Sequence, residues 1–427
     1  SNKVLKKKRT IKNSDITKPI FDEFKDESNI IKMQAIDINF WLIKDILQKA
    51  LLLTLEKYKA FKVKVRRGFF WYYLDENKKE PIISNKIKPT FEFIHYKDNN
   101  EYLFKISYEG KKIVIDYFHI LTDGNSGREF FNELIYNYVK IKHPRSIPST
   151  KMTEVVVEKE PENSYTKNYK KKFSKAYVPP KAYQVKGHKI ENGKVGINHF
   201  NIKLNELKKN AKEKGCSISQ FLVSMIAYSL YETNYKKNKG RKPINICVPI
   251  NLKKYFPSET ISNFVSHMMV SLKLNRKKKH TFDDILSMVK KEFDKKLNID
   301  KISATMNSNG KAINNFFVRT LPLFIKKPAV VLGSLSVKKQ FTMTFSNLGE
   351  TAINEEYKKF VDDCTFTLVP DWSEKIRCGV CSYKGNLVVT FSSNIKEDSF
   401  ERKFRDLLKE MGIKVKIKGN GIKAITN

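Results

Sequence analysis

His119 is the histidine, among seven in the chain, whose neighbours best fit a catalytic role. It opens the segment His119-Ile-Leu-Thr-Asp123-Gly124. An imidazole with an ordinary pKa of about 6.5 is neutral near pH 7, so it can take a proton from a hydroxyl or amine and return it later. We expect Asp123 to brace the loop by pairing with a cation, and Gly124 to permit a tight turn. The segment predicts a general base for acyl transfer, although a buried histidine at the end of a strand fits it equally well.

A β-hairpin followed by a helix is predicted to present this segment. Two runs of alternating apolar residues, 103–108 and 113–118, flank the turn Glu109-Gly110. Strand side chains alternate, which places His119 at the end of the second strand, on its apolar face. Phe130 and the apolar residues after it repeat at helical spacing, with Ser126 as the predicted N-cap. The candidate base therefore lies in a loop between a strand and a helix.

The remaining pattern predicts an α+β protein. Apolar spacing predicts a helix over 37–59 and strands over 61–74. The region from 142 to 195 is polar, rich in lysine and interrupted by prolines. The second half is predicted to contain strands at 195–204, 243–250, 341–346, 362–369, 378–383 and 387–393, and helices at 205–214, 218–236, 281–297 and 397–411, the helix at 218 being capped by Ser217 or Ser219.

Length favours two domains, because 427 residues exceed the size at which one hydrophobic core usually stops growing. We expect an N-terminal domain over 1–165, a crossover linker over 166–195 and a C-terminal domain over 196–427. The five cysteines are scattered and odd in number, which is typical of a reducing cytoplasm. No apolar run has the length of a membrane span, and the start has no signal-peptide core, so we expect a cytoplasmic protein.

The formal net charge of +37 admits nucleic acid, an anionic membrane or an anionic cofactor as partners. The basic runs at 6–9, 170–172 and 276–279 lie in different predicted regions. Solvated surface lysines therefore explain the charge better than a nucleic-acid site does, while peripheral contact with an anionic membrane stays open. No phosphate-binding loop or dinucleotide fingerprint is present in the sequence.

Two other groups of residues have types that could form a site. Cys378 and Cys381 have the spacing of a redox or metal pair, but no second ligand pair follows at a suitable distance, so buried strand packing is the better interpretation and no metal is expected. Trp41, Trp71 and the aromatic run 69–73 could stack on bases, but their apolar context favours the core.

Several segments resemble the acyltransferase superfamily related to chloramphenicol acetyltransferase, which includes alcohol acetyltransferases and the condensation domains of nonribosomal peptide synthetases. The segment from His119 to Ser126 resembles its HxxxDG active-site motif. Further segments resemble those of bacterial alcohol-acetyltransferase-like proteins, in the same order along the chain: Arg66-Arg67-Gly68-Phe69-Phe70-Trp71-Tyr72-Tyr73-Leu74, Val248-Pro249-Ile250-Asn251-Leu252-Lys253, Thr260 with Asn263-Phe264, and Thr344-Phe345-Ser346-Asn347-Leu348-Gly349.

The resemblance implies a pseudo-dimer of two similar α+β domains with an active-site tunnel between them. It implies that His119 deprotonates an alcohol, which attacks an acyl-CoA thioester directly; no bound cofactor is implied, and a monomer is expected. Ser346 or Asn347 would donate a hydrogen bond to the oxyanion, and Asn263 would belong to the tunnel. Lys253 stands where the family has arginine, which keeps the charge but loses the bidentate fork.

Two alternatives remain open at this point. One is a condensation-like domain that takes the acyl group from a carrier protein and makes an amide or ester. The other is a catalytically inactive protein of the same fold whose basic surface binds nucleic acid or anionic lipid.

Overall fold

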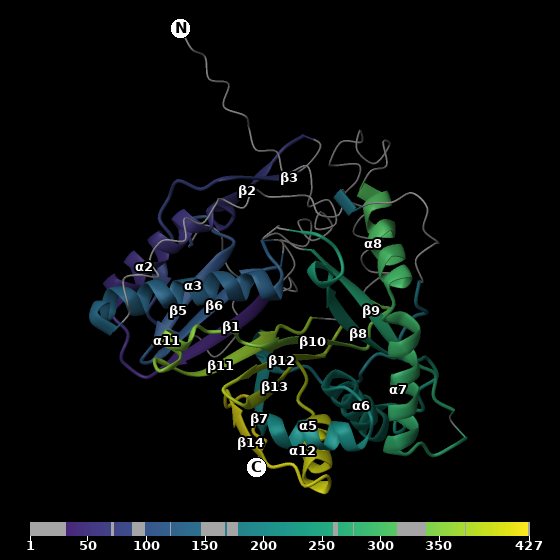
Figure 1. Cartoon of the computed structure of the whole chain (residues 1–427). Helices are drawn as coiled ribbons and strands as arrows, with labels where there is room; N and C mark the ends of the chain where they lie inside the picture. The colour runs from purple at the N-terminus through teal and green to yellow at the C-terminus, as the bar shows by residue number, and fades with distance from the viewer. Residues whose placement is uncertain are drawn as a thin grey trace.

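Figure 1 shows the computed structural model of the chain. It describes residues 31–69, 72–87, 99–119, 121–146, 167–168, 178–258, 264–275, 277–313, 339–371 and 373–425. Within these ranges, none of the helices combines the length and apolar character needed to cross a bilayer.

The first lobe is built on a five-stranded sheet in the order β11-β1-β6-β5-β4. Helices α2 and α3 pack on it, and the side chains that these elements bury form one hydrophobic core (Figure 1). Its elements are β1 (Ile31–Ile38), α2 (Lys44–Lys57), β4 (Ile83–Ser84), β5 (Phe104–Glu109), β6 (Lys112–Phe118), α3 (Gly124–Lys142), α11 (Glu355–Lys358) and β11 (Val361–Leu368), with a separate hairpin of β2 (Val63–Arg67) and β3 (Tyr72–Glu76).

The second lobe is built on a seven-stranded sheet in the order β14-β7-β13-β12-β10-β8-β9. Helices α5, α6, α7 and α12 contribute to its core. Its elements are β7 (Gly196–Lys203), α5 (Leu204–Glu213), α6 (Ile218–Leu230), β8 (Ile244–Asn251), β9 (Val265–Leu272), α7 (Phe282–Lys296), α8 (Ile299–Ile313), β10 (Met343–Glu350), β12 (Ile376–Tyr383), β13 (Asn386–Ser393), α12 (Ser399–Glu410) and β14 (Val415–Gly419).

Strand β11 joins the two lobes. It follows β10 of the second lobe in the sequence, yet it pairs with β1 as the edge strand of the first sheet. The next strand, β12, returns to the second sheet between β10 and β13. The chain therefore exchanges one strand between the lobes, and this fixes the first sheet against the second.

Most of the predicted elements are present, and the predicted α+β class is confirmed. The hairpin β5–β6 pairs Glu109 with Lys112 across the turn, where Gly110 has a φ of +59°, a conformation that favours glycine. Ser217, one of the two predicted caps, is the N-cap of α6 and forms a capping box with Gln220. Cys378 and Cys381 lie buried on β12, in agreement with the predicted strand.

Three predictions about the first 75 residues are wrong. The helix predicted over 37–59 begins only at Lys44, because strand β1 extends to Ile38 and a loop over 39–43 follows it. Trp41 and Phe69 do not belong to the core; they are 72% and 67% exposed. Trp71 lies outside the described residues.

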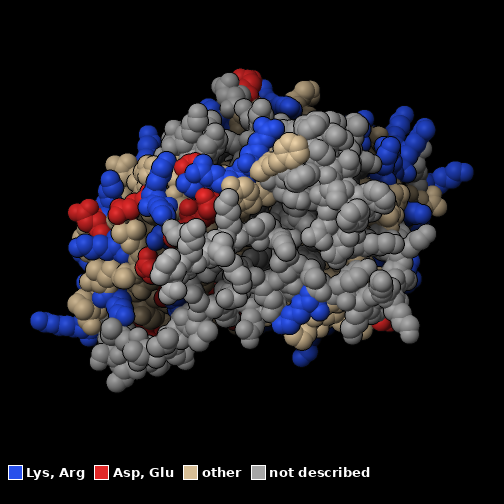
Figure 2. Space-filling view, turned by 90° about the horizontal axis from the view of Figure 1, so that it is seen from above, with Lys and Arg blue, Asp and Glu red and all other residues tan. Residues whose placement is uncertain are grey.

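Basic side chains spread over the face seen from above in Figure 2. They lie at its left, centre and right, among acidic side chains on the left. On this face the described lysines and arginines do not form one stripe, which agrees with the interpretation of the charge as dispersed.

Candidate active site

The predicted motif lies between β6 and α3, and its described residues, 119 and 121–124, are called the motif loop below. His119 directly follows β6 and is half-buried, whereas Thr122 and Asp123 are buried. Strand β6 is anchored by Ile113, Ile115 and Tyr117, which are fully buried in the core of the first lobe. The loop thus starts from a rigid strand and ends at the first turn of a 19-residue helix.

Asp123 caps helix α3. Its Oδ1 accepts hydrogen bonds from the backbone N–H of Asn125 (3.0 Å) and of Ser126 (2.9 Å). A carboxylate at this position satisfies amides that have no partner inside the helix. Its negative charge also interacts favourably with the positive end of the helix dipole. The N-cap is therefore Asp123, three residues before the predicted Ser126. Asp123 was expected to pair with a cation. In the described part of the chain, its carboxylate instead accepts hydrogen bonds from backbone amides.

Gly124 is required by close packing between the lobes. A Cβ atom added to it would lie 2.6 Å from Cδ2 of Leu348, on the second lobe's strand β10. From the other side, buried Gln34 of β1 donates from Nε2 to the carbonyl oxygen of Gly124 (2.9 Å) and to the hydroxyl of Tyr117 (2.8 Å). The turn of the motif loop is thus held by both lobes.

The end of β8 reaches the same loop. Lys253 lies in the turn Leu252–Lys254 directly after β8, and its Nζ donates to Oγ of Ser126 (2.8 Å). The N–H of Phe264 lies 3.5 Å from Oδ2 of Asp123. Lys253, which stands where the family motif has arginine, thus bonds to the first turn of α3.

Arg128 fastens the motif helix to the end of β10. Its Nη1 donates to the carbonyl oxygens of Leu348 and Glu350, both at 3.0 Å, and its Nη2 donates to Oδ1 of Asn125 (3.1 Å). A guanidinium can make these contacts at once because its donors are held in a planar fork. Neither Arg128 nor Gln34 was predicted from the sequence.

Strands β8 and β10 separate as they approach the motif loop. Their register pairs Met343 with Ile246 and Thr344 with Cys247, and goes no further. Beyond this point β10 leads to Leu348 against Gly124, and β8 leads to Lys253 against Ser126. The motif loop therefore lies across the diverging ends of the two strands.

Ser346 and Asn347 face opposite sides of the second sheet. Phe345, which must share the side of Asn347, is buried in the helix-covered core. The amide of Asn347 donates to Oγ of Ser219 in the first turn of α6 (3.3 Å), and its Oδ1 accepts from the N–H of Gly349 (2.8 Å). Ser346 is buried on the other side, the side of Leu348 and the motif loop. Of the two predicted oxyanion donors, only Ser346 faces the lobe that carries His119.

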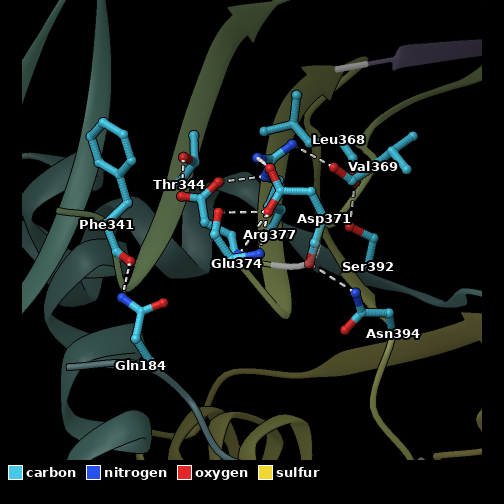
Figure 3. A network of polar contacts seen from close by, with 11 residues as sticks. Gln184, Phe341, Thr344, Leu368, Val369, Asp371, Glu374, Arg377, Ser392 and Asn394 are labelled. Atoms are coloured by element: carbon cyan, nitrogen blue, oxygen red, sulfur yellow. Dashed lines mark hydrogen bonds and ion pairs between the residues drawn. The ribbon is translucent and has the colours of Figure 1, made fainter. Parts of the chain in front are cut away.

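A buried ionic network supports β10 two residues before Ser346 (Figure 3). Thr344 donates from Oγ1 to Oε1 of Glu374 (2.6 Å), and Nε of Arg377 donates to Oε2 of the same carboxylate (2.5 Å). Nη2 of Arg377 donates to Oδ2 of Asp371 (2.9 Å), and Nη1 to the carbonyl oxygen of Val369 (2.6 Å). The network joins β10, β12 and the connection from β11.

Burial and charge act against each other in this network. Burial alone would raise the pKa of Asp371, but Arg377 and hydrogen bonds from residues 373 and 374 lower it. Burial raises the pKa of Glu374 despite the opposing effect of Arg377. An unpartnered charge here would be costly, so each member fixes the position of the others.

The predicted site residues come together only in part. His119, Asp123 and Gly124 form one loop, Lys253 contacts its helix, and Ser346 lies on the strand whose end packs against Gly124. Asn263 and Thr260 lie outside the described residues.

Comparison with known proteins gives matches for the structure but none for the sequence. No protein-family model and no curated protein matches the sequence. Solved structures match over nearly the whole chain. Polyketide synthase associated protein 5 from Mycobacterium tuberculosis is similar with a TM-score of 0.60 and 12% identity, covering 91% of this chain and 95% of its own.

Two further structures share the fold. Trichothecene 15-O-acetyltransferase TRI3 from Fusarium sporotrichioides has a TM-score of 0.59 at 11% identity, covering 95% of this chain and 94% of its own. The starter condensation domain of rhizomide synthetase, a mutant solved with C8-CoA and Leu-SNAC, has a TM-score of 0.54 at 9% identity, with 92% of each chain covered. The chain therefore has the two-lobed α+β fold that these condensation-domain and acetyltransferase structures share, which is the fold expected from the sequence.

Proposed function

We propose that the protein transfers an acyl group from a coenzyme A thioester to an acceptor hydroxyl, with His119 as general base. The observation that carries the proposal is the position of His119 at the start of a loop supported by both lobes. Gln34 and Asp123 hold it from the first lobe, Leu348 packs against it from the second, and Lys253 of the second lobe bonds to the helix that follows. Such cross-lobe support is what a base needs when it must meet two substrates in a fixed geometry.

The proposed reaction balances without a covalent enzyme intermediate. His119 takes the proton from the acceptor hydroxyl as its oxygen attacks the thioester carbonyl carbon. The tetrahedral intermediate that forms carries an oxyanion, to which Ser346 donates a hydrogen bond. The carbon–sulfur bond then breaks, and the leaving thiolate takes the proton back from His119, which yields an ester and free coenzyme A.

Names of the similar structures support the choice of donor and acceptor. One is a 15-O-acetyltransferase, and another was solved with C8-CoA. The same group includes condensation domains, which favours a second candidate, a carrier-bound acyl donor with an amine acceptor. The third candidate is an inactive binding protein of this fold, and the support of the motif loop from two sides speaks against it.

The test is thiol release by the full chain. Acyl-CoA donors of increasing chain length are mixed with primary alcohols, and free thiol and ester are measured together. We expect thiol and ester in equal amounts. Transfer only from an acyl-loaded carrier protein would favour the condensation-like candidate. No transfer across both donor panels, by protein shown to be folded, would contradict the proposal.

A further inference from the structure

One buried glutamine joins the two ends of the motif loop. Gln34 lies on β1, opposite Ile115 of β6 in the strand register. Its Nε2 donates to the hydroxyl of Tyr117 near the end of β6 (2.8 Å) and to the carbonyl oxygen of Gly124 at the start of α3 (2.9 Å). Both hydrogens of one amide group are used in this way. Gln34 therefore connects the strand before His119 to the helix after it.

Tyr117 also packs against the first turn of α3. A Cβ atom added to Gly127 would lie 2.6 Å from Cζ and 2.8 Å from Oη of the tyrosine, so a side chain there would displace the ring. The tyrosine is fully buried, and Gln34 is 4% exposed. A further bond tightens the loop itself, because the N–H of Leu121 donates to the carbonyl oxygen of Phe118 (2.9 Å). Both ends of the loop are thus fixed within the folded protein.

The strand that carries Gln34 is held by both lobes. Strand β1 lies between β6 and β11 in the first sheet, and Gln34 is opposite Phe366 of β11 in the register. The side chain of Phe366 packs in a cluster that includes Leu348, Cys381 and Val388 of the second lobe. The amide cannot shift along β1 without breaking this register, so its two hydrogen bonds start from a fixed point.

We propose that Gln34 is a positioning residue for His119, and that the two hydrogen bonds from its amide set where the imidazole lies between the substrates. This role of Gln34 rests on the proposed function, whereas the joined ends of the loop do not depend on it. A reacting group displaced by about 1 Å can lose about 10²-fold in rate. A bond that sets the width of the loop therefore acts on kcat without touching a substrate.

The role requires two donors at one point, which distinguishes glutamine from glutamate. An ionised glutamate at position 34 would have acceptors only, and it would face the carbonyl oxygen of Gly124. A protonated one would regain a single donor. Burial is expected to raise the pKa of this carboxyl above its ordinary value of about 4.3. Of the charged groups that act on the neighbouring Tyr117, Asp123 would raise that pKa further and Arg128 would lower it.

The main test compares Gln34→Met with Gln48→Met. Methionine has a similar length and no hydrogen-bond donor. Gln48 is the matched control, because its Nε2 donates to the carbonyl oxygen of Pro81 (3.0 Å) in α2, whose start contacts the end of α3 remote from the loop. We expect Gln34→Met to lose about 10²-fold in kcat, with KM changed less than about twofold. Gln48→Met should keep the parental kcat, while both variants melt about 2 °C lower or more.

Two further measurements separate positioning from folding. The kcat of Gln34→Glu, divided by that of the parent at the same pH, should rise about fivefold or more from about pH 8 to about pH 6, as the introduced carboxyl gains a donor. A purely structural defect would leave this ratio flat. The NMR signal of the imidazole Cε1–H of His119, identified by its absence from His119→Ala, should move or broaden in Gln34→Met and stay in place in Gln48→Met.

Each outcome bears on Gln34. A parental kcat and an unmoved His119 signal in folded Gln34→Met would overturn the proposal, and so would an equal loss of kcat in Gln48→Met. If Gln34→Met does not fold, the ratio measured with Gln34→Glu decides, and a flat ratio counts against the role. If the parent transfers no acyl group, the proposed function fails, and the NMR signal alone then shows whether Gln34 sets the position of His119.

Discussion

At the scale of single residues, the structure separates Ser346 from Asn347. Strand β10 turns these adjacent side chains to opposite faces, and Asn347 is already bonded to Ser219 and Gly349. No local feature of the sequence distinguishes a serine facing the other lobe from an asparagine facing the sheet's own helices. The choice depends on which face the helices cover, and that is a tertiary property.

Ser346→Ala should lower kcat by about 10²-fold and leave KM unchanged, because the lost hydrogen bond would form mainly to the transition state. Asn347→Ala is the matched comparison. It removes the bond to Ser219 and should lower the free energy of unfolding by about 1 kcal/mol with little effect on kcat. Steady-state kinetics and thermal melts on both variants measure this, and the opposite assignment of the two effects would show that Asn347 is the donor.

Other residues of the site were beyond prediction for the same reason. Gln34 and Arg128 hold the motif loop and its helix through contacts that span 90 and 220 residues of sequence. A glutamine in a strand or an arginine in a helix carries no sign of such a distant partner. Trp41 illustrates the reverse, since its apolar neighbours predicted burial although the tertiary structure leaves it exposed.

At the scale of elements, local patterns predicted the hairpin that leads to His119, the helix after it and most strands of the second lobe. The error at β1 arose because the apolar spacing of α2 extends into residues that pair as a strand. Pairing between β1 and β11 joins residues more than 300 positions apart, and strand periodicity does not encode such a partner.

The contact between the end of β8 and helix α3 should couple two residues energetically. In a double-mutant cycle of Lys253→Met and Ser126→Ala, we expect a coupling free energy of unfolding of about 1 kcal/mol, because the bond from Nζ to Oγ is partly buried. We also expect each single variant to lower kcat, and the double variant to lower it little further. Lys254→Met, which changes the exposed neighbouring lysine, is the control. Strictly additive effects would remove the assigned role of Lys253.

At the scale of the whole molecule, charged groups from both sheets meet around His199 of β7. Its Nδ1 lies 2.8 Å from Oγ1 of Thr390. Burial, together with Lys112 of the first sheet and Lys418 of the second, lowers the pKa of His199 to about 4. The lobes therefore meet at a histidine that the folded protein keeps neutral.

This histidine predicts a loss of stability in mild acid. Between about pH 4 and pH 6.5 the unfolded chain takes up a proton that the folded chain does not, so the free energy of unfolding falls as pH falls through this window. His199→Gln should reduce that dependence by at most about 3 kcal/mol. Denaturant unfolding of both proteins across the window measures the difference, and parallel curves would show that His199 titrates normally in the fold.

The fold shared with an acetyltransferase and condensation domains does not by itself assign a reaction, since one fold serves several chemistries. The central claim therefore depends on His119. Its most direct test is the rate of thiol release from acyl-CoA by His119→Ala, compared with His188→Ala. The control changes an exposed histidine that precedes β7 and is paired with Glu397. We predict that His119→Ala loses about 10³-fold in kcat or more with an unchanged melting temperature, while His188→Ala keeps the parental rate. Retention of the parental rate by folded His119→Ala would contradict the account.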